Sequence, residues 1–202
     1  METRPIPRWF QWLFGAFMVV YVPAYWAGYG WMNFLWTSNV ILIMSFLATI
    51  FQWRFVASMA AVGGLVAEVI WSLDFIVTAA AVVFGWEIRG FTEYVFRPGL
   101  PVWLRMISAF HLALPPLLIW LIYRLGYDRR AWVVQILFMW VLIAVTWLVT
   151  PPLLNINLVF SYQKYTWLQF GVATYLIVGS LAIGAIIALT HFILLAFFRE
   201  RS

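Results

Sequence analysis

Six polar side chains in this sequence are of the types that acid–base and nucleophilic chemistry uses, and they lie within or at the edges of long apolar segments. They are Thr37, Asn39, Glu68, Asp74, Arg105 and His111. Ionisable groups inside a bilayer are costly unless they are paired, hydrated or face a cavity, so they are candidates for a functional site. A threonine hydroxyl could act as a nucleophile and a histidine as its general base, provided that they nearly touch.

The other polar side chains could support that chemistry or serve the structure alone. Glu68 could orient the ring of His111, and Asn39 or Arg105 could stabilise an oxyanion. In the structural alternative, Glu68 and Asp74 pair with Arg105, and His111 is a hydrogen-bonded core histidine. Thr37 then caps a helix. The sequence leaves both interpretations open.

The composition places these side chains in a membrane protein. Of the 202 residues, 66% are hydrophobic and 9% are charged, whereas soluble proteins have roughly 25% charged residues. Cysteine is absent, which excludes disulfides and thiol catalysis. We expect no cofactor and no metal, because His111 with Glu68 and Asp74 lacks one histidine of the usual zinc pattern.

The apolar segments predict an all-α fold: a polytopic transmembrane helical bundle of about six spans, forming a single domain over residues 1–202. A span needs roughly 20 apolar residues to cross about 30 Å of hydrocarbon. The predicted spans are residues 9–28, 33–52, 55–77, 101–124, 131–150 and 168–197. Residues 78–100 could extend the third span, lie in the interface or re-enter the membrane.

The basic residues predict the orientation of the bundle. The formal net charge of +5 comes from short clusters that flank the apolar runs, which is typical of membrane topology rather than of nucleic-acid binding. With the N-terminus inside, eight of the 12 Lys and Arg residues lie on the inner side. We therefore expect both termini in the cytoplasm.

This orientation brings the candidate residues into the outer half of the bundle. At a rise of about 1.5 Å per residue, Arg105 lies roughly 6 Å deep and His111 roughly 15 Å deep. Glu68 reaches the same half from the inner side, and Thr37 lies roughly 6 Å down. The sequence therefore predicts an outward-facing polar pocket.

Two further features should shape this pocket. Pro115 and Pro116 remove backbone hydrogen bonds, so they should kink the fourth span and free carbonyl groups that need a polar neighbour. Asn155 and Asn157, in the loop after the fifth span, could form a roof over the region.

Five stretches resemble an uncharacterised family of bacterial integral membrane proteins. They are Trp31–Asn39 (WMNFLWTSN), Glu68–Phe75 (EVIWSLDF), Thr92–Pro101 (TEYVFRPGLP), Ser108–Ala131 (SAFHLALPPLLIWLIYRLGYDRRA) and Asn155–Phe160 (NINLVF). The likeness covers about residues 31–160. It implies a multi-pass protein of the bacterial cytoplasmic (inner) membrane, and it implies no activity.

Two shorter motifs are similar to the androgen-induced family of intramembrane threonine hydrolases, which cleave fatty-acid esters of hydroxy fatty acids. The motifs are Thr37 with Asn39, and His111 before Leu114 and Pro115. The threonine-to-asparagine spacing is shorter here than in that family, and the residues around the histidine differ. The resemblance implies Thr37 as nucleophile and His111 as general base.

Three functions remain as alternatives, and the sequence leaves open whether the protein is an enzyme. The first is a lipid-ester hydrolase or acyl-transfer enzyme with membrane lipids as its partners. The second is a non-catalytic accessory subunit that binds other subunits of a larger membrane complex. The third, a carrier of ions or small solutes, is disfavoured because the polar residues thin out toward the inner face.

Overall fold

The chain folds into helices that run back and forth along one axis, in a computed structural model that describes residues 5–86, 90, 92–96, 99, 101–161 and 171–198. The helices are α1 (Arg8–Tyr29), α2 (Thr37–Phe51), α3 (Arg54–Phe84), α4 (Val102–Ile107), α5 (Phe110–Leu125), α6 (Ala131–Val149) and α7 (Val172–Phe198). Short 3-10 helices cover Trp31–Leu35, Glu93–Val95 and Ile156–Leu158. The described residues include no strand, so the predicted all-α class is confirmed.

Five helical segments in the described chain are long and apolar enough to cross a membrane. They are α1, α3, α4 continued by α5, α6 and α7. The sixth, α2, is apolar but only 15 residues long, which is shorter than the roughly 20 residues of a usual span. These segments support the prediction of a multi-pass membrane protein.

Two helix boundaries differ from the predicted spans for local reasons. α2 begins at Thr37 rather than near residue 33, because Trp36 has an extended backbone (φ −57°, ψ 133°) that ends the preceding 3-10 turn. α3 continues to Phe84 and stops at Gly85, whose positive φ suits the end of a helix. The first residues of the predicted sixth span, 168–170, lie outside the described residues, as do residues 87–89, 91, 97, 98 and 100.

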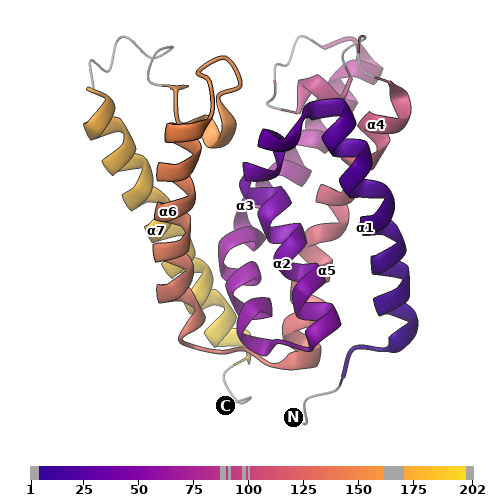
Figure 1. Ribbon diagram of the computed structural model, residues 1–202, viewed down its shortest axis with the longest axis vertical. Helices are drawn as coiled ribbons and strands as arrows, with labels where there is room; N and C mark the ends of the chain where they lie inside the picture. The colour runs from indigo at the N-terminus through magenta and orange to yellow at the C-terminus, as the bar shows by residue number, and fades with distance from the viewer. Residues whose placement is uncertain are drawn as a thin grey trace.

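The order of the helices in space gives the bundle two distinct ends. Arg8, where α1 begins, and Phe198, where α7 ends, lie at the same end, which we call the terminal end (Figure 1). The opposite end carries the turns that follow α1, α3 and α6 (Figure 1). α3 lies at the centre and packs against α2, α5, α6 and α7.

Close packing at the centre depends on a glycine where three helices meet. A Cβ atom at Gly64 of α3 would lie 2.7 Å from Ile41 Cγ2 of α2 and 3.2 Å from Leu118 Cδ1 of α5. Both neighbours are fully buried, so neither can move away freely. Small residues allow helices to approach closely in lipid, where packing rather than the hydrophobic effect holds them together.

The membrane pass formed by α4 and α5 is interrupted between Ile107 and Phe110. The two residues predicted to kink it, Pro115 and Pro116, instead lie inside α5. Pro115 has no N–H to donate to the carbonyl of His111, four residues earlier. Ser72 of α3 donates its hydroxyl to that carbonyl instead, at 3.4 Å. The freed carbonyl therefore has the polar neighbour that the sequence argument requires.

The packing at Gly64 predicts the effect of one added methyl group. We expect Gly64→Ala to destabilise the protein by about 1–3 kcal/mol, because the methyl overpacks a buried site. Gly15→Ala is the matched control, since nothing lies within 4 Å of a Cβ atom at that position. Thermal unfolding in detergent checks this, and equal midpoints for the two variants would contradict it.

Candidate functional site

A buried histidine–carboxylate pair joins α5 to α3. Nδ1 of His111 lies 2.7 Å from Oε2 of Glu68, and the residues are 8% and 1% exposed. The imidazole lies between two aromatic rings, Trp71 and Phe110, each with its centroid 4.1 Å away and nearly parallel. The pair and the two rings fix the orientation of the imidazole.

This arrangement leaves one ring nitrogen of His111 for other chemistry. Nδ1 is occupied by Glu68, which favours the tautomer with the proton on Nδ1 and a lone pair on Nε2. Nε2 makes no hydrogen bond to any described residue. It is also not one of the fully buried nitrogen and oxygen atoms that lack a hydrogen-bond partner. A histidine with a carboxylate at one ring nitrogen and an unoccupied second nitrogen has the arrangement of a general base.

Thr37 has a different partner from the one that the resemblance implies. Oδ1 of Asn157 accepts hydrogen bonds from Thr37 N at 2.9 Å and from Thr37 Oγ1 at 3.0 Å. Nδ2 of Asn157 donates to Leu35 O at 2.8 Å. Asn157 therefore caps the start of α2 and ties it to the loop after α6. Of the described residues, Asn157 rather than His111 holds the threonine hydroxyl.

Asn39 also has two partners that tie helices together. Its Oδ1 accepts a hydrogen bond from Tyr21 OH at 2.7 Å, and its Nδ2 donates to Asn33 O at 2.6 Å. Both ends of the amide are therefore engaged in joining α2 to α1 and to the preceding turn. The side chain is buried and would have to break one of these bonds to stabilise an oxyanion.

Asp74 and Arg105 hold the segment between α3 and α4. Oδ2 of Asp74 accepts hydrogen bonds from Thr92 N at 2.9 Å and from Thr92 Oγ1 at 2.7 Å. Nη1 of Arg105 donates to Val95 O at 3.0 Å. In the described part of the chain, Arg105 therefore forms no ion pair with Glu68 or Asp74, because each carboxylate has another partner.

The structure adds a serine that the sequence argument missed. Ser108 precedes His111 by three residues, at the interruption between α4 and α5, and its Oγ lies 2.6 Å from Tyr25 OH. Tyr25 belongs to a series with Tyr21 and Tyr29 at four-residue spacing on α1, with ring centroids 4.3 Å and 5.1 Å apart. That spacing places all three on one helix face, and it could have been read from the sequence.

Tyr94, in the 3-10 helix before α4, reaches the same region. Burial and the nearby Tyr29 raise the pKa of Tyr94 to about 12, although the nearby Ser108 and Trp71 act to lower it. The phenol therefore stays protonated near neutral pH and can donate a hydrogen bond. Glu68 is also close enough to influence it. Glu68 contacts His111 directly, and Tyr94 lies near enough to Glu68, Tyr29 and Ser108 to interact with them.

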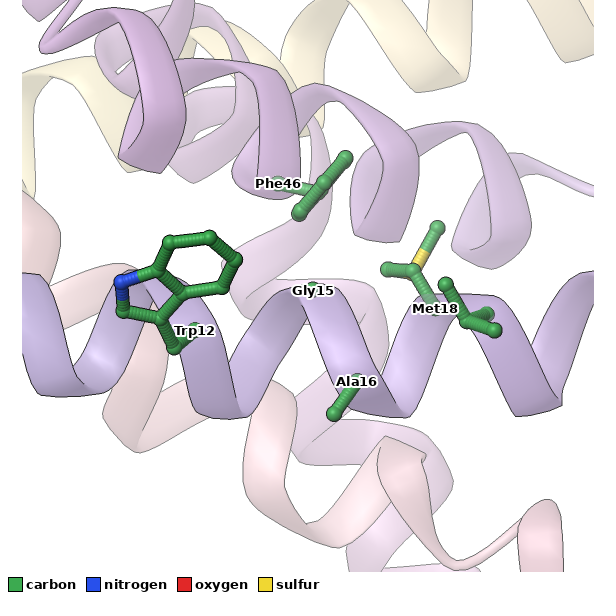
Figure 2. A pocket seen from close by; sticks show the side chains of 6 residues that line it. Trp12, Gly15, Ala16, Met18 and Phe46 are labelled. Carbon is green, nitrogen blue, oxygen red and sulfur yellow. The ribbon is translucent and has the colours of Figure 1, made fainter.

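A surface hollow that is lined by apolar residues lies elsewhere. It measures about 480 Å³ and is open to the surroundings, between α1 and α2 (Figure 2). Its lining consists of Trp12, Gly15, Ala16, Met18, Val19 and Phe46. None of the six candidate residues lines it. It offers room for a hydrocarbon chain but no group for acid–base chemistry.

The second histidine, His191 of α7, lies in a separate site. Its Nδ1 is 2.6 Å from Tyr127 OH, in the turn after α5, and its ring stacks on Trp132 with centroids 5.1 Å apart. It has no carboxylate partner within the described residues. His191 therefore provides a buried histidine for comparison with His111.

The chain matches no known family, and no curated protein or solved structure is significantly similar to it. The family likenesses noted above therefore stay predictions, and the function must be argued from the site. Of the six candidate residues, the structure joins Glu68 directly to His111, and it places Thr37, Asn39, Asp74 and Arg105 in other hydrogen bonds.

The contacts of Asn157 predict a structural role for it. We expect Asn157→Leu to lower the free energy of unfolding by roughly 2 kcal/mol or more, because four hydrogen bonds of about 1 kcal/mol each are lost, the fourth to Thr146 Oγ1 at 3.3 Å. Thr37→Val, which removes one of them, should cost about 1 kcal/mol. Chemical unfolding in detergent checks both values.

Asn33→Leu is the control for these two variants, since the hydrogen bonds between Asn33 and other described residues all use its backbone atoms. Equal stability of Asn157→Leu and Asn33→Leu would show that the contacts of Asn157 are unimportant.

Proposed function

We propose that the protein is an intramembrane hydrolase that cleaves an ester bond of a lipid, with His111 as general base and Glu68 as its orienting carboxylate. The observation that carries the proposal is the 2.7 Å contact between His111 Nδ1 and Glu68 Oε2, which leaves Nε2 without a hydrogen bond to any described residue. An intramembrane ionisable pair is a candidate functional site by default.

In the proposed reaction, Nε2 of His111 takes a proton from a water molecule while the oxygen of that water attacks the ester carbonyl carbon. The resulting imidazolium is stabilised by Glu68. When the tetrahedral intermediate collapses, the imidazolium gives its proton to the departing alkoxide, so that an alcohol and a carboxylic acid are released. Buried donors such as Tyr94 could stabilise the negative oxygen of the intermediate.

Water is the simplest nucleophile for this geometry. The likeness to the intramembrane threonine hydrolases favours Thr37, but its hydroxyl donates to Asn157 and would have to leave that partner to attack. Water activated by His111 needs no such rearrangement. An acyl-transfer reaction would follow the same scheme with an alcohol in place of water.

A lipid is the substrate class that suits the surroundings of this pair. The helices that carry it are apolar and long enough to span a membrane, so a substrate approaching from the bilayer must itself be lipid-like. If both termini are cytoplasmic, as the basic residues predict, the site lies in the outer half of the bacterial inner membrane. If the pair is only structural, the protein is better described as an accessory subunit of a membrane complex.

A matched pair of variants tests the proposed role of the dyad. We expect Glu68→Gln to lower kcat by about 10²-fold, since the imidazolium loses its charge partner, and His111→Gln to lower it by about 10²–10⁴-fold. Glu68→Gln should leave KM nearly unchanged. The assay is hydrolysis of a long-chain p-nitrophenyl ester and of bacterial phospholipids by the full chain in proteoliposomes.

His191→Gln is the control, and it should retain full activity in folded protein. Thr37→Val distinguishes the nucleophiles, because activity should persist if water attacks and vanish if Thr37 does. An absence of hydrolysis by the unaltered protein on every lipid ester, or full activity in folded His111→Gln protein, would reject the enzyme and favour the accessory subunit.

A further inference from the structure

Two hydrogen-bond donors near the dyad have no partner in the described part of the chain. They are the hydroxyl of Tyr29 and the Nε of Arg105, and both atoms are buried. An unpaired buried donor loses its hydration without compensation, so such groups are rare unless something else binds them. Among the described residues, Arg105 also has no carboxylate partner, and its guanidinium donates one hydrogen bond, from Nη1 to Val95 O.

The Tyr29 hydroxyl and the Arg105 guanidinium lie near each other, at the end of the bundle opposite the terminal end. The ring centroid of Tyr29 lies 5.1 Å from that of Tyr25, whose hydroxyl lies 2.6 Å from Ser108 Oγ. Tyr29 is also close enough to Arg105 and Ser108 to interact with them electrostatically, although its hydroxyl makes no hydrogen bond to a described residue. Arg105 and Ser108 are three residues apart, and Ser108 N donates to Arg105 O at 3.1 Å. Tyr25 and Tyr94 approach Ser108 from two other segments.

We propose that Tyr29, Arg105 and Ser108 form a binding site for the phosphate group of a lipid headgroup, beside the Glu68–His111 dyad. A guanidinium with surrounding hydroxyl donors suits a phosphate, which presents several oxygens in different directions. A carboxylate would use fewer of these donors. The evidence for the binding site is the set of contacts made by Tyr29, Arg105 and Ser108. Its consequence for catalysis rests on the proposed function.

The depth of the site fits a headgroup. Trp26 lies one turn before Tyr29, and Trp103 lies two residues before Arg105; both are exposed. Exposed tryptophans mark the level of the headgroups in membrane proteins. His111 follows Arg105 by six residues, or about 9 Å along a helix. A phosphate at Arg105 would therefore place the ester groups of a glycerophospholipid deeper, toward His111.

The test measures lipid binding rather than hydrolysis. The full chain in neutral detergent is titrated with phosphatidylglycerol, and bound lipid is counted by native mass spectrometry. We expect stoichiometric binding that weakens at least tenfold in Arg105→Gln and severalfold in Tyr29→Phe. Arg130→Gln is the charge-matched control, since Arg130 is exposed and pairs with Asp128, and it should bind as the unaltered protein does.

Tyr29→Phe keeps the test decisive if Arg105→Gln fails to fold, because it removes only an oxygen that has no hydrogen-bond partner among the described residues. Three competitors define the ligand: diacylglycerol, oleate and inorganic phosphate. Weak competition by all three supports a phosphate-bearing lipid. Equal competition by diacylglycerol or oleate overturns the phosphate assignment, and equal competition by inorganic phosphate overturns the lipid assignment.

The two proposals fail separately in this design. Glu68→Gln should bind phosphatidylglycerol normally, since Glu68 belongs to the dyad. Binding that depends on Arg105 and Tyr29 in a protein without hydrolytic activity would support the headgroup site and reject the enzyme. Unchanged binding in both Arg105→Gln and Tyr29→Phe would reject the headgroup site, whatever the activity.

Discussion

The hydrogen bond between Glu68 and His111 is the interaction around which the candidate site of this bundle is built. Two ionisable groups buried among apolar helices are stabilised by pairing, because burial removes most of their hydration. The pair also determines how α3 faces α5, since Ser72 and Trp71 of α3 contact His111 as well. The aromatic rings on both sides of the imidazole then allow it little freedom to rotate.

The backbone of the fourth pass is adapted to this pair. Because Pro115 has no N–H, the carbonyl of His111 has no hydrogen-bond donor within its own helix, and the hydroxyl of Ser72 donates to it instead. The helix interruption at Ser108 and Ala109 lets Ser108 meet Tyr25 of α1. One short segment therefore contacts α1 through Ser108 and α3 through His111. This is how residues distant in sequence come to surround one imidazole.

The sequence predicted the helices better than the contacts between them. Hydrophobic runs identify helices because their length must match the bilayer, and the ionisable residues within them stand out against that background. Partners are harder to predict, since Thr37 and Asn157 lie 120 residues apart and no local spacing indicates their contact. The tyrosine series on α1 was missed because aromatic residues occur throughout the chain, and its polar ends become apparent only beside Ser108.

The most direct test of the account is the state of the His111 ring itself. In protein labelled with ¹⁵N-histidine and carrying His191→Gln, so that one histidine remains, NMR can identify which ring nitrogen holds the proton. The account predicts a protonated Nδ1 with a far-downfield proton that is lost in Glu68→Gln, and an Nε2 without a proton when the ring is neutral. A proton on Nε2, or a Nδ1 signal unaffected by Glu68→Gln, would contradict it.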